Sequence, residues 1–454
     1  MLKSRISYWA ILLLLTAQNS YAQDYLREWI NAAVEQNGGV KNARLDVETG
    51  IIKQRKVKST FLPTLTASAT YARAKVGLSD LHVSATVPAD YVALGAGLAG
   101  VMGLPENPIP GQIETTINKD YEGLDIFTAG LSSRWILFTG FKAYHLNQAT
   151  IYEQQARQQL IRREKAAVIR EVVQLHDKLA LIHASENVLA KSRERLQGEK
   201  KRVMKAFEIG LASKYDAQKI ELASLNLQSK AVELAGQKRL VKQRIHQLTG
   251  IDESELQVAE LEVMVISTEI LNSERPEILA MEQGIKAHEA KVKSVNSGYM
   301  PKVALMGSYQ YMDLDLAKAD PIAFVGVGAS WNLFDGFHTN QEKQLAKIEM
   351  QKAQNECEEA RHLSEMALEK AGVELEISSA KLEIAEQGLD NARLAHNIRK
   401  SEFVEGLVSV NEFLEAESDL QNAQLEFLKA MFQQRQSVLS YYEATGNLSE
   451  NIFD

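Results

Sequence analysis

Trp135-Ile136-Leu137-Phe138-Thr139-Gly140-Phe141 returns 196 positions later as Trp331-Asn332-Leu333-Phe334-Asp335-Gly336-Phe337. The same offset of 196 takes Gly210-Leu211 to Gly406-Leu407. One gapless register therefore joins long segments of the two halves of the chain. Self-similarity on this scale indicates a duplicated structural unit, so the fold has to be understood as two copies.

The first copy carries an insertion. Phe61-Leu62-Pro63 corresponds to Tyr299-Met300-Pro301 at an offset of 238, which exceeds the main offset by 42 residues. We place the insertion at about residues 73–124, which hold four of the eight prolines. We expect an external connection that tolerates changes in length. Its apolar stretch from Tyr91 to Leu104 either packs as an external loop or touches lipid.

The amino terminus predicts export. Lys3 and Arg5 precede an apolar run and a Ser-Tyr-Ala sequence, which together are typical of a signal peptide over residues 1–22. Its removal changes the net charge from −8 to −10. A chain this acidic is a poor candidate for binding nucleic acid. Cys357 is the only cysteine, so we expect neither an intrachain disulfide nor a lipid anchor at the cleavage site.

Two stretches predict very long helices. No proline occurs between Lys142 and Leu271 or between Gln341 and Asp454. In the second stretch, leucines recur every seven residues from Leu368 to Leu389, with small residues between them. A seam of this kind favours closely packed coiled-coil helices. The glycines at 210 and 406 interrupt each stretch, so we expect two helical hairpins, over residues 142–248 and 338–445.

Four segments predict strands of about ten residues, near residues 63–72, 125–138, 301–312 and 323–334. They alternate apolar residues with small polar ones, as in Leu65, Ala67, Ala69 and Tyr71 against intervening threonine and serine. The pattern fits either transmembrane strands or a soluble two-hairpin sheet. Serine, threonine and glycine on the polar face favour a narrow water-filled lumen, and hence the membrane alternative.

Four strands cannot close a barrel, for which about eight is the practical minimum. Open sheet edges are not tolerated in lipid, so membrane-spanning strands here require several copies of the chain to share one barrel. The predicted organisation is a signal peptide at 1–22, a first repeat at 23–250 and a second repeat at 251–454.

These features together resemble the TolC family of outer-membrane efflux channels. The resemblance covers nearly the whole mature chain and rests on the two turns at 137–141 and 333–337, on Arg275-Pro276-Glu277, and on the two hairpin tips. It implies a mainly helical fold with a transmembrane β part. In it, a homotrimer forms a 12-stranded β-barrel, which continues as a long α-helical coiled-coil barrel through the periplasm of a Gram-negative bacterium.

The resemblance also implies a function and sites. The trimer would be the passive exit duct for an inner-membrane transporter of RND or ABC type, joined through a periplasmic adaptor. The tips would dock the adaptor through Gly210, Leu211, Ser213, Gly406, Leu407 and Ser409. Glu412 and Glu415 would form an entrance ring that selects cations, together with Asp216; Lys219 would pair with Glu415. The alternative for the two glutamates is that they only stabilise a helix start.

No pattern predicts catalysis, a metal site or a cofactor. The literal G-x-G-x-x-G at Gly95–Gly100 is followed by three prolines, which prevent the helix that a dinucleotide site needs. The nine histidines show no metal-ligand spacing. The remaining alternative function is a periplasmic or surface coiled-coil scaffold that conducts nothing.

Overall fold

The structure is a computed structural model that describes residues 25–76, 81–86, 112–117, 121–209, 212–258, 260–264, 274–314, 317–318 and 321–449. The predicted signal peptide lies outside these residues, as does most of the insertion. The chain divides into two compact units. One unit comprises Met1–Val47, Gln155–Glu282 and Asn355–Asp454, and the other comprises Glu48–Gln154 and Gln283–Gln354.

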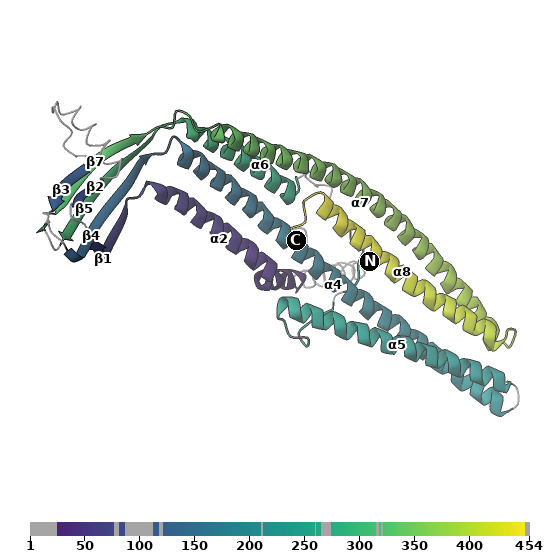
Figure 1. Ribbon diagram of the computed structural model, residues 1–454. Coiled ribbons are helices and arrows are strands. Elements are labelled where there is room, and N and C mark those ends of the chain that lie inside the picture. The colour runs from purple at the N-terminus through teal and green to yellow at the C-terminus, as the bar shows by residue number, and fades with distance from the viewer. Residues whose placement is uncertain are drawn as a thin grey trace, which may run out of the picture. The chain divides into compact units, whose positions relative to one another are not determined.

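The second of these units contains an antiparallel sheet (Figure 1). Its main strands are β1 (Thr64–Val76), β4 (Tyr121–Phe138), β5 (Lys302–Leu314) and β7 (Ile322–Ser330), paired in the order β1-β4-β5-β7. The two-residue strand β6 (Ala317–Lys318) also pairs with β5. Among the described residues, β1 and β7 each pair with a single neighbour, so both edges of the sheet are open.

The strand register gathers the two kinds of side chain on opposite faces. Tyr71 pairs with Phe127 and Ala67 with Leu131, whereas Thr66 pairs with Ser132. Directly paired residues of antiparallel strands share a face. The next ladder continues the division, since Leu131 pairs with Tyr309 and Ser132 with Ser308. One face of the sheet is therefore mainly apolar, and the other carries many small polar residues.

Some boundaries differ from those expected. Strand β1 extends to Val76 and β4 begins at Tyr121, so both continue into the expected insertion. Two further strands, β2 (Leu81–Thr86) and β3 (Gln112–Ile117), pair only with each other among the described residues. In the second half, β7 ends at Ser330, so Trp331 to Phe334 follow the strand rather than end it.

The repeated turns between strand and helix use an uncommon backbone conformation. Gly140 and Phe141 have φ angles of 65° and 68°, and Gly336 and Phe337 have 66° and 65°. A positive φ favours glycine, so both phenylalanines are strained. Each is held by an edge-to-face ring contact with the phenylalanine three residues earlier. The duplicated sequence thus builds the same turn twice.

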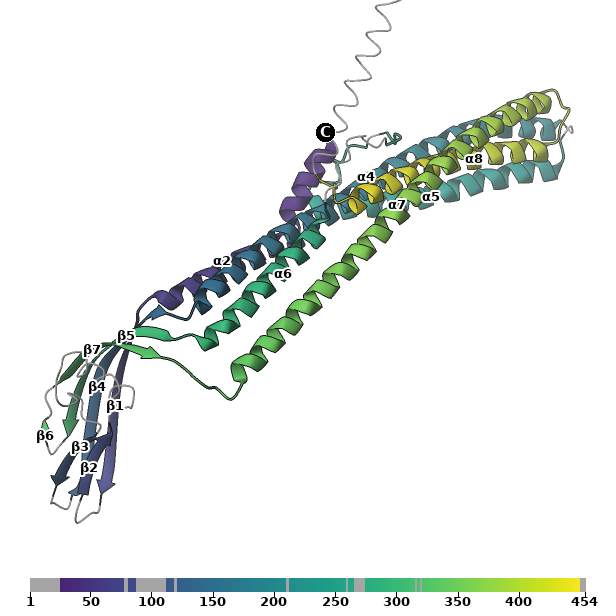
Figure 2. The same cartoon turned by 90° about the horizontal axis from the view of Figure 1, so that it is seen from above.

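Two helical hairpins follow the turns, visible in Figures 1 and 2 as α4 beside α5 and α7 beside α8. Helices α4 (Lys142–Glu208) and α7 (His338–Val404) have 67 residues each, which is roughly 100 Å at 1.5 Å per residue. The return helices are α5 (Lys214–Thr249) and α8 (Val410–Ala444). These elements confirm the predicted mainly helical architecture with long helices and a small antiparallel sheet.

Two shorter helices complete the fold, α2 (Gly38–Lys58) and α6 (Pro276–Val295). Residues 25–36 are also helical, and Leu26, Trp29, Ile30, Ala33 and Val34 are buried at helical spacing. They join one hydrophobic core with residues of α4, α5 and α8. A second core lies nearer the hairpin tips and includes Leu189, Leu196 and Val203 of α4 with Ile220 and Leu227 of α5.

Candidate functional site

The tip of the first hairpin is organised by a helix cap. Gly210 and Leu211 lie outside the described residues. Ser213 is the N-cap of α5: its hydroxyl accepts a hydrogen bond from the Asp216 N–H at 3.1 Å, and the Asp216 carboxylate accepts one from the Ser213 N–H at 3.0 Å. This reciprocal capping box satisfies two backbone donors. Asp216 thus has a structural role at the start of α5.

The second tip repeats this arrangement. Gly406 has a φ of 77°, and the Leu407 N–H donates to the Glu402 carbonyl at 2.8 Å. Ser409 caps α8, and its N–H donates to the Glu412 carboxylate at 2.8 Å. That hydrogen bond is the main reason why the pKa of Glu412 lies below its usual range. The Leu407 side chain is 70% exposed, which leaves an apolar group at the outermost turn.

Glu415 differs from the two capping carboxylates. It is exposed, and no hydrogen bond or ion pair to it occurs among the described residues. Lys219, expected to pair with it, instead lies over the Tyr215 ring with its Nζ 5.3 Å from the ring centre. Of the three predicted ring residues, Glu415 is therefore the one whose carboxylate makes the fewest contacts with the described residues of its own chain.

A buried carboxylate, not predicted from the sequence, lies farther along α8. The Arg195 guanidinium of α4 binds the Glu417 carboxylate. Its Nε and Nη2 atoms donate hydrogen bonds to Oε1 at 3.0 and 2.8 Å. His396 Nε2 of α7 approaches Oε2 to 2.8 Å, without the alignment of a directed hydrogen bond. The Glu417 and His396 side chains are only 6% and 3% exposed. The cluster therefore joins three helices from both hairpins.

The charge of Glu417 is maintained by its partners. Burial alone would raise the pKa of its carboxyl, but the contacts with His396 and Arg195 outweigh burial and hold the pKa below its usual range. A buried ion pair of this kind is strongly destabilised when one partner is removed. We therefore regard Glu417 as the charge that fixes the two hairpins of one chain against each other.

The repeat register offers a signal that could have located this cluster. Moving 196 positions back takes His396 to Lys200 and Glu417 to Glu221. Lys200 and Glu221 form an ion pair between α4 and α5, but both side chains remain considerably exposed. A lysine–glutamate pair in the first hairpin thus corresponds to a buried histidine–glutamate pair in the second. This difference between the two copies could have identified His396 and Glu417 from the sequence.

Two further ion pairs join α4 to α8 in the same register. Asp177 lies 18 residues before Arg195 on α4 and accepts a hydrogen bond at 2.7 Å from Arg435, which lies 18 residues after Glu417 on α8. Arg170 lies seven residues before Asp177, Glu443 lies eight residues after Arg435, and these two also pair. Eighteen residues are about five helical turns and seven or eight are about two, so all three pairs lie on matching faces. We name these three pairs the α4–α8 charge ladder.

The middle pair of the ladder also binds other segments. Asp177 is 1% exposed and accepts a hydrogen bond from Gln436 as well as from Arg435. Burial would raise its pKa, but contact with His176 and with Arg435 keeps it below its usual range. Arg435 in turn donates to the backbone carbonyl of Glu262. The ladder thus also fastens the segment that links the two halves.

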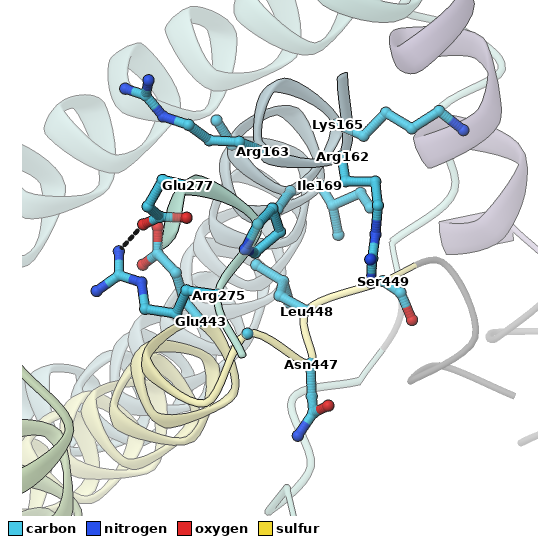
Figure 3. Close-up of a pocket in the computed structure, with 14 residues that line it drawn as sticks. Arg162, Arg163, Lys165, Ile169, Arg275, Glu277, Glu443, Asn447, Leu448 and Ser449 are labelled. Carbon is cyan, nitrogen blue, oxygen red and sulfur yellow. Dashed lines mark ion pairs between the residues drawn. The ribbon is translucent and has the colours of Figure 1, made fainter. Parts of the chain in front are cut away.

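A cavity of about 690 Å³ lies beside the beginning of α6 (Figure 3). Arg275 and Glu277 form an ion pair across Pro276, the first residue of the helix. Other lining residues come from α4 and from the end of the chain, among them Arg162, Glu443 and Leu448. The Arg275-Pro276-Glu277 motif therefore has a structural function at this helix start.

The described residues contain neither a cluster of metal-ligating side chains nor a long apolar helix. No three histidine, cysteine, aspartate or glutamate side chains gather there in a way that could hold a metal ion. Among those same residues, no helix combines the length and apolar character needed to cross a membrane. Cys357 is free and buried.

Comparisons with known proteins agree with the fold. Residues 268–447 match the family model described as outer membrane efflux protein. No curated protein matches the chain significantly. Among solved structures, CusC shares the fold with a TM-score of 0.74 at 14% identity, covering 93% of this chain and 92% of its own.

Two further structures are similar over comparable lengths. The outer membrane protein VceC from Vibrio cholerae gives a TM-score of 0.73 at 15% identity, with 93% of this chain and 96% of VceC covered. The CmeC outer membrane channel of Campylobacter jejuni gives 0.70 at 18% identity, with 93% and 85% covered. The family match and these structures together confirm the resemblance to the TolC family.

Proposed function

Because the chain carries an outer membrane efflux protein domain over residues 268–447, we propose that it is an outer-membrane channel that works as a homotrimer. It would be the exit duct of a tripartite efflux or type I secretion system, placed in the outer membrane of a Gram-negative bacterium and extending into the periplasm. Conduction through it would be passive, driven by an inner-membrane transporter of RND or ABC type.

The observation that carries this proposal is the open sheet. Strands β1 and β7 each lack a second partner among the described residues. Unpaired backbone N–H and C=O groups are very unfavourable in hydrocarbon, so spanning strands must form a closed barrel. Three copies of β1-β4-β5-β7 would supply twelve strands, enough to close one. The apolar face would then meet lipid, and the serine- and threonine-rich face would line the lumen.

The helical hairpins support the remainder of the proposal. Their length, roughly 100 Å for α4 and α7, suits a tunnel that reaches across the periplasm. Leu407 is exposed at the second tip, and the repeat places Leu211 at the corresponding position of the first. We propose that these tips, with Gly210, Gly406 and the two capping serines Ser213 and Ser409, dock a periplasmic adaptor.

Three carboxylates near the tips would control entry. Threefold symmetry would bring three copies each of Glu415, Glu412 and Asp216 to one constriction, and close like charges attract cations and repel anions. Since Glu412 and Asp216 also cap helices, we assign the larger part of cation selection to Glu415.

Conductance measured with purified protein in a planar bilayer tests the proposed function. Discrete channels with a preference for cations are expected. A purified, folded protein that inserts into vesicles yet gives no conductance would contradict the channel and favour a non-conducting scaffold.

Replacement of the tip glycine tests the docking assignment. Gly406→Trp places a bulky side chain at a residue with a positive φ, which strains the turn, and it covers the proposed adaptor surface. Export should therefore be lost while the trimer yield stays unchanged. Gly388→Ala, in the interior of α7 with open space around its Cβ position, is the matched control. Normal export by Gly406→Trp would show that the tips are not the docking surface.

A further inference from the structure

Two basic residues lie on the serine- and threonine-rich face of the sheet. Arg134 of β4 shares this face with Ser132, and Lys302 of β5 shares it with Ser308, because alternate residues of a strand point the same way. Both side chains are exposed, and neither makes a hydrogen bond or an ion pair with the described residues. Their charges are therefore uncompensated within the part of the chain that the structure describes.

The same face carries no acidic residue that could neutralise them. The strand segments 64–73, 125–138, 302–313 and 322–330 contain two acidic residues, Asp125 and Asp313. Asp125 lies directly opposite Arg73 and forms an ion pair with it, and Asp313 lies directly opposite Phe127. Both aspartates share the mainly apolar face with Phe127. Over these segments, the polar face therefore has no charged residue besides Arg134 and Lys302.

The duplication places the two cations at one and the same position of the repeat. Arg134 lies directly opposite Thr64, and Lys302 lies directly opposite Ser330. The offset of 196 takes Arg134 to Ser330, and the upstream offset of 238 takes Thr64 to Lys302. Each copy therefore has one cross-strand pair at this place, made of one basic residue and one hydroxyl residue. The basic residue is on the second strand of the first copy and on the first strand of the second copy.

These cross-strand pairs lie near the strand ends that join the helices (Figure 2). Thr64 and Lys302 begin β1 and β5, which follow α2 and α6 along the chain. Ser330 ends β7, and Arg134 is close to the end of β4, just before α4. In a barrel built from three chains of two copies each, equivalent positions of the copies come to similar heights. Two cations from each of three chains would therefore form one positively charged ring around the lumen.

We propose that this cationic ring, formed by Arg134 and Lys302, binds oxyanions, and that the duct exports organic anions carrying carboxylate, phosphate or sulfonate groups. Arginine and lysine are the side chains that bind such groups, and arginine can donate to two oxygens of one group at once. A passage lined by charges of one sign also raises the local concentration of the opposite charge. This inference rests on the proposed barrel, because there the polar face of the sheet lines the lumen.

The cationic ring acts differently from the carboxylates of the hairpin tips. The proposed entrance gathers Glu412, Glu415 and Asp216 at a constriction, where they act on every ion that passes. A barrel of twelve strands is wider than one of eight, whose side chains fill the interior, and charges farther apart than about 10 Å are screened at 0.1 M salt. The cationic ring therefore acts on ligands that touch the barrel wall, whereas the entrance sets the preference for small cations.

Block of the channel by a polyanion tests the oxyanion site. Tripolyphosphate, added to the chamber on the barrel side of a planar bilayer, should lower the conductance of the parent protein as its concentration rises. The double variant Arg134→Gln with Lys302→Gln should raise the half-blocking concentration by about tenfold or more, because the local excess of anions is lost. Arg73→Gln removes a basic residue from the opposite face of the same sheet and should leave the block unchanged.

Two further sets of variants separate the effect of charge from that of shape. Arg134→Lys with Lys302→Arg exchanges the two side chains but keeps both charges, so most of the block should be retained. The single variants Arg134→Gln and Lys302→Gln should weaken the block to similar extents, because the two positions are equivalent in the repeat. These single variants also decide the question if the double variant forms no channels.

Failure of the oxyanion site and failure of the channel give different results. If tripolyphosphate blocks the parent and the double variant equally, or blocks neither although both conduct, the oxyanion site is overturned and the channel proposal stands. An effect of Arg73→Gln as large as that of Arg134→Gln would also overturn the site. A folded parent protein that inserts into the bilayer without conductance would instead overturn the channel on which the site depends.

Discussion

At the scale of single residues, the charged side chains that contribute most to the packing of the helices were not among those predicted from the sequence. Glu412, Glu415 and Asp216 follow from the position of a tip glycine, because a tip is a local feature. Glu417 and Arg195 lie 222 residues apart, and neither belongs to a periodic pattern that predicts contact. Burial of a charged group depends on which helices pack together. Comparison of the two copies could have drawn attention to Glu417, but its burial and its contact with Arg195 come from the structure.

The Glu417 cluster predicts a specific loss of stability. Glu417→Gln leaves the partly buried Arg195 without its charge partner and should lower the free energy of unfolding by about 3 kcal/mol or more. The control is Glu221→Gln at the equivalent, exposed position of the first hairpin, which should cost about 1 kcal/mol or less. Urea unfolding followed by circular dichroism at 222 nm measures both. Similar values for the two variants would show that the buried Glu417 cluster contributes no more to stability than the exposed pair.

The same cluster predicts how stability changes with pH. Since the pKa of Glu417 is lowered in the folded state, its stabilising effect is present above the unfolded value of about 4.3 and is lost as the pH falls through the lowered value. The unfolding midpoint of the parent chain should therefore fall more steeply below about pH 4 than that of Glu417→Gln. Parallel curves would contradict the assignment.

Substitution of Glu415 should change ion selectivity without lowering stability. Glu415 is exposed and makes no hydrogen bond or ion pair with the described residues. Glu415→Gln should therefore reduce the preference for cations and weaken block by trivalent cations in a bilayer recording. Glu412→Gln keeps the capping box but removes a negative charge near the start of α8, so it should cost only about 0.5 kcal/mol. If Glu415→Gln leaves selectivity unchanged, the carboxylates serve only to start a helix.

At the scale of elements, most of the fold could be predicted. Long proline-free stretches with heptad leucines predicted α4 and α7, and the interrupting glycines predicted the turns to α5 and α8. Strand ends were less predictable. Trp331 continues the alternation of β7 but lies beyond its end at Ser330. Its indole N–H donates to the backbone carbonyl of Tyr299 at 3.0 Å. Trp135 makes the equivalent bond to Phe61, although there the strand continues.

The two strand-to-helix turns provide a matched pair of substitutions. Gly140 and Gly336 have the same positive φ, but a Cβ on Gly140 would lie 2.7 Å from the Met300 Cβ, whereas nothing lies within 4 Å of one on Gly336. Gly336→Ala should therefore cost only backbone strain, about 1 kcal/mol. Gly140→Ala adds a clash and should cost about 2–4 kcal/mol.

Urea unfolding of the two alanine variants, compared with the parent chain, measures this difference. A larger loss for Gly336→Ala than for Gly140→Ala would show that the packing around the first turn differs from that in the structure.

At the scale of the whole molecule, the described residues of one chain leave both edges of the sheet and one face of α7 without partners. The open edges of β1 and β7 require partners if the sheet spans a membrane. Helix α7 exposes large apolar side chains, among them Leu363, Ile384 and Leu394, that no helix of the described residues covers. Oligomerisation could be inferred from the sequence by counting strands. Which helix faces remain uncovered in one chain could not be inferred, because that depends on how the helices pack.

Native mass spectrometry of the mature protein, released from detergent micelles, measures how many chains share the proposed barrel. A single dominant species with three times the mass of the mature chain is expected, and it should persist until the detergent or the temperature unfolds it. A stable, folded monomer that remains soluble without detergent would contradict the shared barrel and, with it, the assignment as an outer-membrane channel.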